Sequence, residues 1–176
     1  MEGYIYILKP FFENPNLKVG IRELSRLIKL NHTTTRDYLM KLKKDNFLSS
    51  KKERIYTLYY LNNNKKTQNL KLFYNLEKLR ESNLIEDLEK AYDFPTVILF
   101  GSYSNATDDL NSDLDLCIIT NIKKEFNTTK YEKIIKRKIS IHKFSHNSWN
   151  ISKKKNPNLI NNICNGMVLS GQVEVL

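Results

Sequence analysis

A strand-like segment, a small-residue turn and an acidic strand lie between residues 97 and 118, and they constrain the fold more than any other feature. The apolar run Val97-Ile98-Leu99-Phe100 leads directly into Gly101-Ser102. Further along, Asp113 and Asp115 alternate with the apolar residues of a second run. Side chains alternate between the two faces of a strand, so we expect both carboxylates on one face and the apolar residues in a core on the other.

This pattern suits a site for phosphate and a divalent metal. Two neighbouring carboxylates repel each other and favour a cation between them, and hard oxygen ligands select Mg²⁺ or Mn²⁺. Gly101 permits close approach of the backbone to a ligand, and Ser102 offers a hydroxyl and a backbone N–H to a phosphate. The alternative is a tight turn followed by a solvated acidic strand end. The strand, the turn and the paired acids together favour the site.

Ten residues separate Ser102 from Asp113, and the latter belongs to a Ser-Asp-Leu-Asp-Leu segment. This arrangement resembles the signature of the minimal nucleotidyltransferases of the polymerase-β-like superfamily. The resemblance implies transfer of a nucleoside monophosphate, AMP from ATP, to a hydroxyl of a protein or nucleic acid with Mg²⁺ or Mn²⁺. It also implies that Asp113 and Asp115 are catalytic and hold the metal, and that Gly101, Ser102 and Ser112 bind the nucleotide. Antitoxin members of the family adenylylate a tyrosine of a partner toxin, so a toxin is one candidate acceptor.

The resembled family usually carries a third carboxylate on the following strand, which here is expected over residues 138–144. Ser140 and His142 occupy the face where that acid is expected, and neither is an acid. His142 is a candidate general base or phosphate contact, or else an ordinary, partly exposed residue. Asp108 and Asp109 are alternative sources of the acid, although solvated loop residues are the expected reading. The sequence therefore leaves open whether the site is catalytically active.

Positive charge is concentrated in the first third of the chain. The 176 residues carry a formal net charge of +10, and residues 1–62 hold 12 basic and 6 acidic residues. A basic region of this kind indicates a polyanionic partner. Alternatively, the positive charge reflects only a lysine-rich composition caused by genome bias.

The same region has the pattern of three helices followed by a basic hairpin. Helical spacing of apolar residues covers 4–13 and 21–29, and Asn31 is a suitable N-cap for a third helix. Two β-like runs, 47–49 and 55–59, follow. The arrangement resembles the winged helix-turn-helix domains that precede nucleotidyltransferase domains in many archaeal proteins. The resemblance rests on the segments Arg22-Glu23-Leu24, Asn31-His32-Thr33-Thr34-Thr35 and Tyr38-Leu39-Met40-Lys41-Leu42.

A winged helix of this type implies contact with nucleic acid, with DNA favoured over RNA. The third helix would enter the major groove and the hairpin would contact the phosphate backbone. Winged helices also serve as protein-docking modules, so that reading stays open. The expected nucleic-acid contacts are Thr33, Thr34, Arg36 and Lys41 in the helix and Lys51, Lys52 and Arg54 in the hairpin.

The sequence thus predicts an α+β protein in which a winged helix-turn-helix precedes a small mixed-sheet nucleotidyltransferase domain with flanking helices. The expected boundaries are a winged helix over 1–62, a helical connector over 63–92 and the nucleotidyltransferase domain over 93–176. A competing function is a DNA-binding transcriptional regulator whose nucleotidyltransferase domain has lost catalysis and senses nucleotide.

Localisation and assembly are constrained mainly by missing signals. The sequence has no recognisable signal peptide, and no apolar run reaches the roughly 18 residues of a membrane span. We therefore expect a cytoplasmic protein without membrane contact. Two cysteines, Cys117 and Cys164, do not form a disulfide framework, and Cys117 is expected to be a small packing residue. A homodimer is left open.

Overall fold

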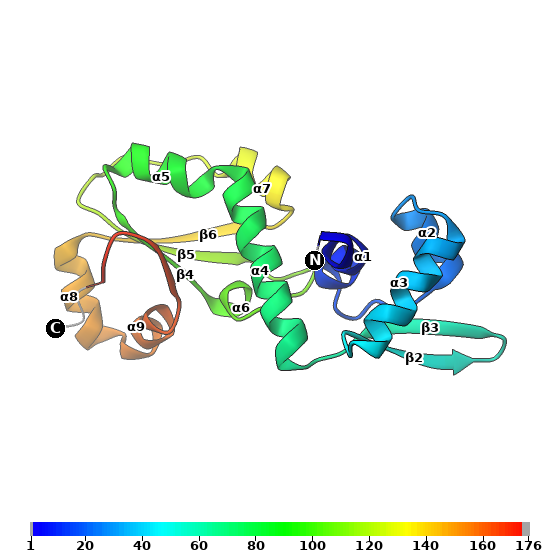
Figure 1. The fold of residues 1–176 in the computed structure, drawn as a ribbon. Coiled ribbons are helices and arrows are strands. Elements are labelled where there is room, and N and C mark those ends of the chain that lie inside the picture. The colour runs from blue at the N-terminus through cyan, green and yellow to red at the C-terminus, as the bar shows by residue number, and fades with distance from the viewer. Residues whose placement is uncertain (1, 174–176) are drawn as a thin grey trace. The chain divides into compact units, whose positions relative to one another are not determined.

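The computed structural model describes residues 2–173, which divide into two compact units between Lys71 and Leu72 (Figure 1). The boundary between the units falls inside helix α4 (Lys65–Ser82). The other elements of the first unit are α1 (Glu2–Glu13), β1 (Val19–Gly20), α2 (Ile21–Leu27), α3 (His32–Lys44), β2 (Leu48–Glu53) and β3 (Tyr56–Leu61).

Helix α3 begins where the sequence predicted. The side chain of Asn31 accepts a hydrogen bond from the backbone N–H of Thr34 at 2.7 Å, which satisfies one of the free N–H groups of the first turn. Thr35, Leu39 and Leu42 are buried along one face of the helix. These three residues form the inward face of the helix.

The hairpin differs from its predicted form because its strands are longer. Strands β2 and β3 pair antiparallel from Leu48 opposite Leu61 to Glu53 opposite Tyr56, and β1 pairs with the other edge of β3. The polar segment 50–54 between the two predicted runs shortens to a tight connection in which Arg54 has a φ of 54°. Lys51 and Lys52 thus belong to β2 rather than to a turn.

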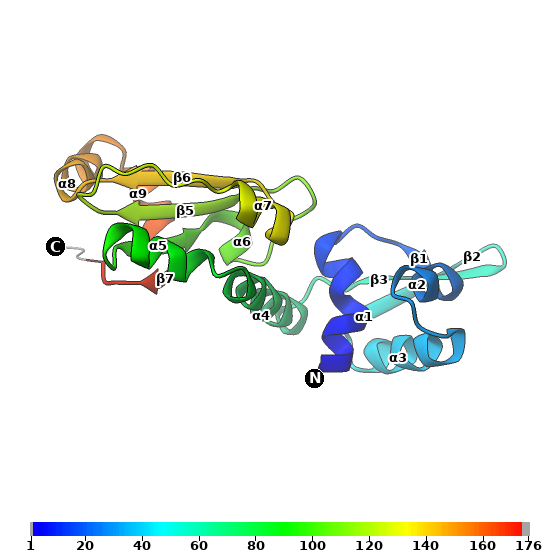
Figure 2. The same ribbon diagram turned by 90° about the horizontal axis from the view of Figure 1, so that it is seen from above.

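The second unit is built around one mixed four-stranded sheet. Its strand order is β6-β5-β4-β7, with β5 and β6 parallel and the other neighbours antiparallel (Figure 2). Besides the greater part of α4, the unit contains α5 (Leu84–Tyr92), β4 (Thr96–Phe100), α6 (Gly101–Ser104), β5 (Leu114–Ile119), α7 (Thr129–Ile135), β6 (Ile139–Phe144), α8 (His146–Lys155), α9 (Pro157–Cys164) and β7 (Met167–Ser170).

Helices cover both faces of this sheet. Leu116 of β5 belongs to a core shared with α4, α5 and α7, whereas Cys117 belongs to a second core with Trp149 of α8 and with α9. The predicted alternation of β5 is confirmed, and Cys117 is a buried packing residue. From Cys117 onward, helices α8 and α9 cover the face of β5 that carries the carboxylates. Asp113 and Asp115 lie at the start of the strand, ahead of these helices.

Two elements after β5 differ from what their sequences suggest. Residues 131–138 have a helical pattern, but α7 ends at Ile135, because Lys136 adopts a left-handed conformation with a φ of 56°. A lysine run beside Asn-Pro is typical of a solvated loop, but the run 153–155 forms the last turn of α8. That helix is capped by Ser145, whose side chain accepts from Ser148 N–H at 3.1 Å. Within the described residues, no helix is long and apolar enough to cross a membrane.

Candidate nucleotide and metal site

The carboxylates lie at the centre of the sheet of the second unit. Asp113 is exposed immediately before β5, and Asp115 is half-buried as the second residue of that strand. Asp115 pairs in register with Phe100 of β4 on one side and with Ser140 of β6 on the other. The strand pairing therefore brings the Gly-Ser turn after β4 beside the carboxylates, as the sequence predicted.

The environment of Asp115 disfavours a bare negative charge. Burial raises the pKa of the Asp115 carboxyl above its usual value, nearby His142 opposes this shift, and the negative charge of Asp113 adds to it. Burial removes water from the carboxylate, and a like charge makes ionisation costlier still. A cation between the two carboxylates would relieve both effects.

Gly101 is required where it stands. Its φ of +74° is a conformation that residues with a side chain rarely adopt. A methyl group at this position would lie 2.6 Å from Oδ2 of Asp115, closer than atoms that are not hydrogen-bonded can approach. The glycine therefore allows the start of α6 to lie directly against a catalytic candidate.

The two serines predicted to bind nucleotide occupy different surroundings. Ser102 is half-buried in the single turn of α6, and its carbonyl accepts from the N–H of Thr107 at 3.0 Å. Ser112 lies in the loop before β5, where its hydroxyl donates to Asp109 Oδ1 at 3.1 Å and accepts from Asp109 N–H at 2.9 Å. Ser102 is therefore beside Gly101, whereas the hydroxyl of Ser112 shapes the loop.

The position expected for a third acid is occupied by Ser140 and His142 of β6. Both are half-buried, and Ser140 Oγ lies 3.4 Å from Nε2 of His142. The His142 ring also meets the Phe100 ring edge-on, with 5.3 Å between ring centroids. Among the described residues no group of three or more histidine, cysteine or acidic side chains is arranged to hold a metal ion. The residues beside the carboxylate pair on β6 are therefore a serine and a histidine.

Asp108 is not the solvated loop residue that the sequence suggested. It is 1% exposed, its Oδ1 accepts from Asn75 Nδ2 at 3.0 Å, and its Oδ2 lies 3.6 Å from the guanidinium of buried Arg137. Buried charges of this kind require a partner, and Arg137 supplies it. Sequence reasoning missed Asn75 and Arg137 because they come from α4 and from the turn after α7, far from the loop along the chain.

The two carboxylates suit Mg²⁺ or Mn²⁺. Mg²⁺ is commonly bound through one or two carboxylates, with phosphate oxygens of the substrate and water as further ligands. Asp113 and Asp115 offer such oxygens, and burial, opposed by His142 and aided by the charge of Asp113, raises the pKa of the Asp115 carboxyl. Asp113 and Asp115 therefore fit the metal that the sequence predicted.

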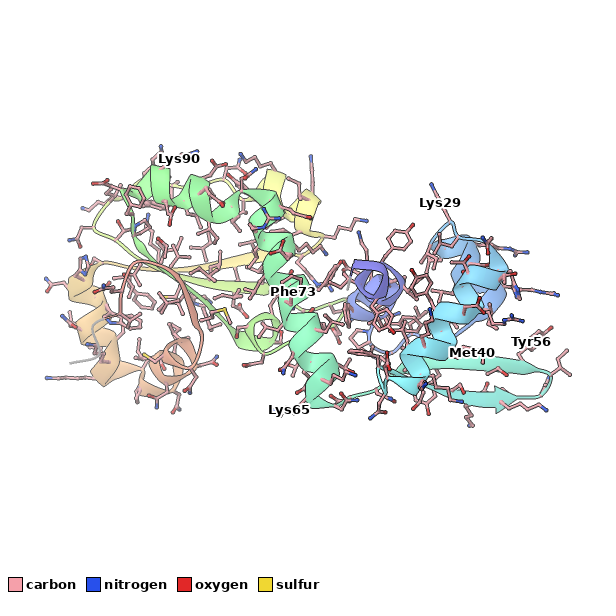
Figure 3. The ribbon with its side chains drawn as sticks, viewed as in Figure 1. Lys29, Met40, Tyr56, Lys65, Phe73 and Lys90 are labelled. Atoms are coloured by element: carbon pink, nitrogen blue, oxygen red, sulfur yellow. The ribbon has the colours of Figure 1, made fainter. Side chains whose placement is uncertain are left out.

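The residues predicted to contact nucleic acid lie on the surface of the first unit. Arg36 and Lys41 are exposed on α3 with Thr33, Thr34 is half-buried, and all three hairpin residues are exposed. Figure 3 shows Tyr56 at the free end of the hairpin, where 65% of it is exposed. A groove of about 1040 Å³ is lined by Arg22 of α2, by the start of α3 and by hairpin residues 53–58.

Paired carboxylates beside a Gly-Ser turn suit a site for phosphate and a divalent metal. A sequence profile of the nucleotidyltransferase domain matches residues 81–170, a little over half of the chain, and the chain belongs to this family. The matched span includes all four strands of the sheet. Domains of this family generally use a nucleoside triphosphate and Mg²⁺. No curated protein and no solved structure gives a significant match.

Proposed function

We propose that the protein transfers AMP from ATP to a hydroxyl of a protein or nucleic acid. The observation that carries the proposal is the carboxylate pair held beside Gly101. A methyl group on Gly101 would lie 2.6 Å from Oδ2 of Asp115. In the reaction, the acceptor oxygen bonds to the α-phosphorus, the bond to the bridging oxygen breaks, and pyrophosphate leaves. Catalysis of this kind rests on positioning and charge neutralisation rather than on a covalent enzyme intermediate.

Each part of the site has a proposed task. Asp113 and Asp115 hold Mg²⁺, which supplies positive charge to the triphosphate when it is bound. Gly101 and Ser102 hold the triphosphate through the backbone and the hydroxyl, and Ser112 supports nucleotide binding indirectly by fixing, through Asp109, the loop that carries Asp113. ATP is proposed as the donor from the resemblance to minimal nucleotidyltransferases that adenylylate their targets.

We propose His142 as the group that takes the proton of the acceptor hydroxyl. It lies on the same face of the sheet as Asp115, and Ser140 is within 3.4 Å of its Nε2. A histidine can accept this proton near neutral pH without carrying the negative charge of a third acid. His142→Gln should lower kcat. An unchanged kcat would remove His142 from the reaction.

The activity is tested with α-³²P-labelled ATP, GTP, CTP and UTP, in Mg²⁺ or Mn²⁺, with protein and nucleic-acid acceptors. We expect label transfer from ATP by the wild-type protein and none by Asp113→Ala. Correct folding of the variant is checked by its thermal unfolding. Absence of transfer, with wild type and Asp113→Ala indistinguishable, would refute the enzymatic proposal.

We propose further that the first unit is a winged helix-turn-helix that targets the protein to DNA. The order of three helices and a three-stranded sheet, with exposed Arg36 and Lys41 on α3, supports this proposal. Contacts of these cations with phosphates release counterions, so duplex binding should weaken steeply between about 50 and 200 mM salt. A gel shift that is independent of salt would contradict DNA binding.

A second candidate function is a DNA-binding regulator that senses nucleotide without catalysis. One observation favours it, namely that Ser140 stands opposite Asp115 where the resembled family carries an acid. This candidate predicts that ATP with Mg²⁺ raises the thermal stability of the protein and changes its DNA affinity while no label is transferred. Label transfer that depends on Asp113 would exclude it.

A further inference from the structure

A cleft of about 450 Å³ lies beside Asp113, separate from the Gly-Ser turn. One wall is the loop 110–113, and the other is formed by α7 and residues 136–138. No element of the first unit contributes to it. The cleft therefore belongs to the second unit alone and opens next to a residue that we assign to the metal.

The lining of this cleft carries an excess of positive charge. The ammonium groups of Lys133, Lys136 and Lys138 are exposed and form no hydrogen bond or ion pair within residues 2–173. Glu132 also lines the cleft, and its Oε1 accepts from the N–H of Ile139 at 3.0 Å and from the hydroxyl of the N-cap Thr128 at 3.2 Å. The lining therefore sets the three lysines against two carboxylates, those of Glu132 and Asp113.

Both walls are held in place by contacts within the protein. The ion pair of Asp108 with Arg137, 3.6 Å long and buried, ties the base of the loop to the turn after α7. Within the loop, Asp109 Oδ1 accepts from Asn111 N–H at 2.9 Å. The left-handed Lys136 directs the chain from α7 toward β6. The lysines therefore project from backbone segments that these contacts hold in place.

The position of the cleft indicates which substrate it serves. Gly101-Ser102 follows β4 on one side of Asp115, whereas Lys138 leads into β6 on the other side. In phosphoryl transfer the attacking and leaving oxygens lie roughly in line on opposite sides of the phosphorus. With the triphosphate at Gly101-Ser102, the cleft lies on the other side of Asp115, where an acceptor hydroxyl opposite the leaving group can be placed.

We infer that this cleft binds the last phosphodiester of a single-stranded nucleic acid whose terminal 3′-hydroxyl is the acceptor. The inference rests on the proposed transfer activity and specifies its substrate class. In such an acceptor an anionic phosphate stands at a fixed, short distance from the reacting hydroxyl, which matches lysines placed beside Asp113. The hydroxyl of a serine or tyrosine side chain brings no anion of its own. The 3′-oxygen attacks the α-phosphorus, pyrophosphate leaves, and the proton passes to His142.

The cleft is suited to the phosphate backbone of a nucleic acid rather than to its bases. Its lining contains no aromatic ring, and Leu110 is its only large apolar residue. Sequence-tolerant binding of single strands usually combines a basic groove with aromatic stacking, and only the basic part is present here. We therefore expect capture of the phosphate at the chain end with little dependence on the terminal base.

The first test measures binding without chemistry, in Mg²⁺ and without nucleotide. A 5′-fluorescein-labelled uridine dodecamer is titrated with the full chain, and its fluorescence anisotropy is followed at several salt concentrations. Lys133→Ala/Lys138→Ala is compared with Lys123→Ala/Lys124→Ala, which removes two exposed lysines from the loop at the opposite end of β5. Loss of two phosphate contacts should flatten the salt slope by about 1.4 and weaken binding about 20-fold near 0.1 M salt. Equal slopes and affinities for the two double variants would overturn the inference.

The second test locates the chain end directly. The same dodecamer with a photoreactive 4-thiouridine at its 3′ end is irradiated with the protein, and the linked peptides are identified by mass spectrometry. Links within 110–113 or 129–138 support the inference, and links confined to residues 1–71, or none, overturn it. Because neither test uses nucleotide, a protein that captures the oligonucleotide but transfers no label fails only the proposed activity. A protein that labels a polypeptide without capturing the oligonucleotide fails only this inference.

Discussion

Gly101→Ala should separate the stability of the second unit from the chemistry of its site. The substitution places a methyl group 2.6 Å from Asp115 Oδ2 and puts a side chain on a residue with a φ of +74°. Backbone strain of this kind costs about 1–3 kcal/mol. For a unit of about 100 residues each kcal/mol lowers Tm by about 4–8 °C. The carboxylate must also move, because the methyl group occupies its space.

Gly171→Ala is the matched control. Gly171 has a φ of +70°, and a methyl group there would lie 2.9 Å from the carbonyl oxygen of Pro95, far along the chain from the acids. Both variants should lose Tm in thermal unfolding followed by circular dichroism. Only Gly101→Ala should also lose label transfer and the rise in Tm that Mg²⁺ with ATP gives to the wild type. Wild-type activity in Gly101→Ala, or equal loss of activity in the two variants at a temperature where both are folded, would refute the reasoning.

Three further predictions follow from single side chains. Asp108→Ala leaves the guanidinium of Arg137 without its buried partner and should lower the free energy of unfolding by about 3–5 kcal/mol in urea; a loss below about 1 kcal/mol would contradict the buried ion pair. Because burial raises the pKa of Asp115, the folded state favours the neutral carboxyl, and its ionisation lowers stability as pH rises through that pKa. Asp115→Asn should therefore raise Tm at pH 7 in EDTA while abolishing transfer. The gain in Tm should vanish below about pH 4, where the carboxyl is protonated in both states. An unchanged or lower Tm at pH 7 would contradict this account. Burial also raises the pKa of the Cys117 thiol to about 12, so iodoacetamide at pH 8 should modify only exposed Cys164 in the native protein and both thiols in denaturant; native alkylation of Cys117, read by mass spectrometry, would disprove its burial.

Features that depend on neighbouring residues could be predicted from the sequence. The alternation of Asp113 and Asp115 with apolar residues follows from the two-residue period of a strand. The cap at Asn31 follows from the need of a helix for an acceptor at its first turn, and the structure has this hydrogen bond. Both predictions succeeded because each feature is determined by a few residues that are neighbours in the sequence.

Features that depend on distant residues could not be predicted in this way. Asp108 looked like a solvated loop residue, and only the fold brings Arg137 within 3.6 Å of it. Helix α8 was missed because its polar sequence has little periodicity and its burial rests on one large side chain, Trp149. In each case the deciding contact is made with a residue on another element, and sequence spacing does not report such contacts.

The sequence by itself determined the nucleotidyltransferase signature, because a strand, a glycine turn and alternating acids leave few other arrangements. Tertiary structure decided what surrounds that signature. Strand pairing placed Ser140 opposite Asp115, and the left-handed turn at Lys136 brought the lysines around it to the cleft beside Asp113. The physical reason is that local alternation orients side chains along one strand, whereas the charge and ligands of a site depend on which strands and turns become neighbours.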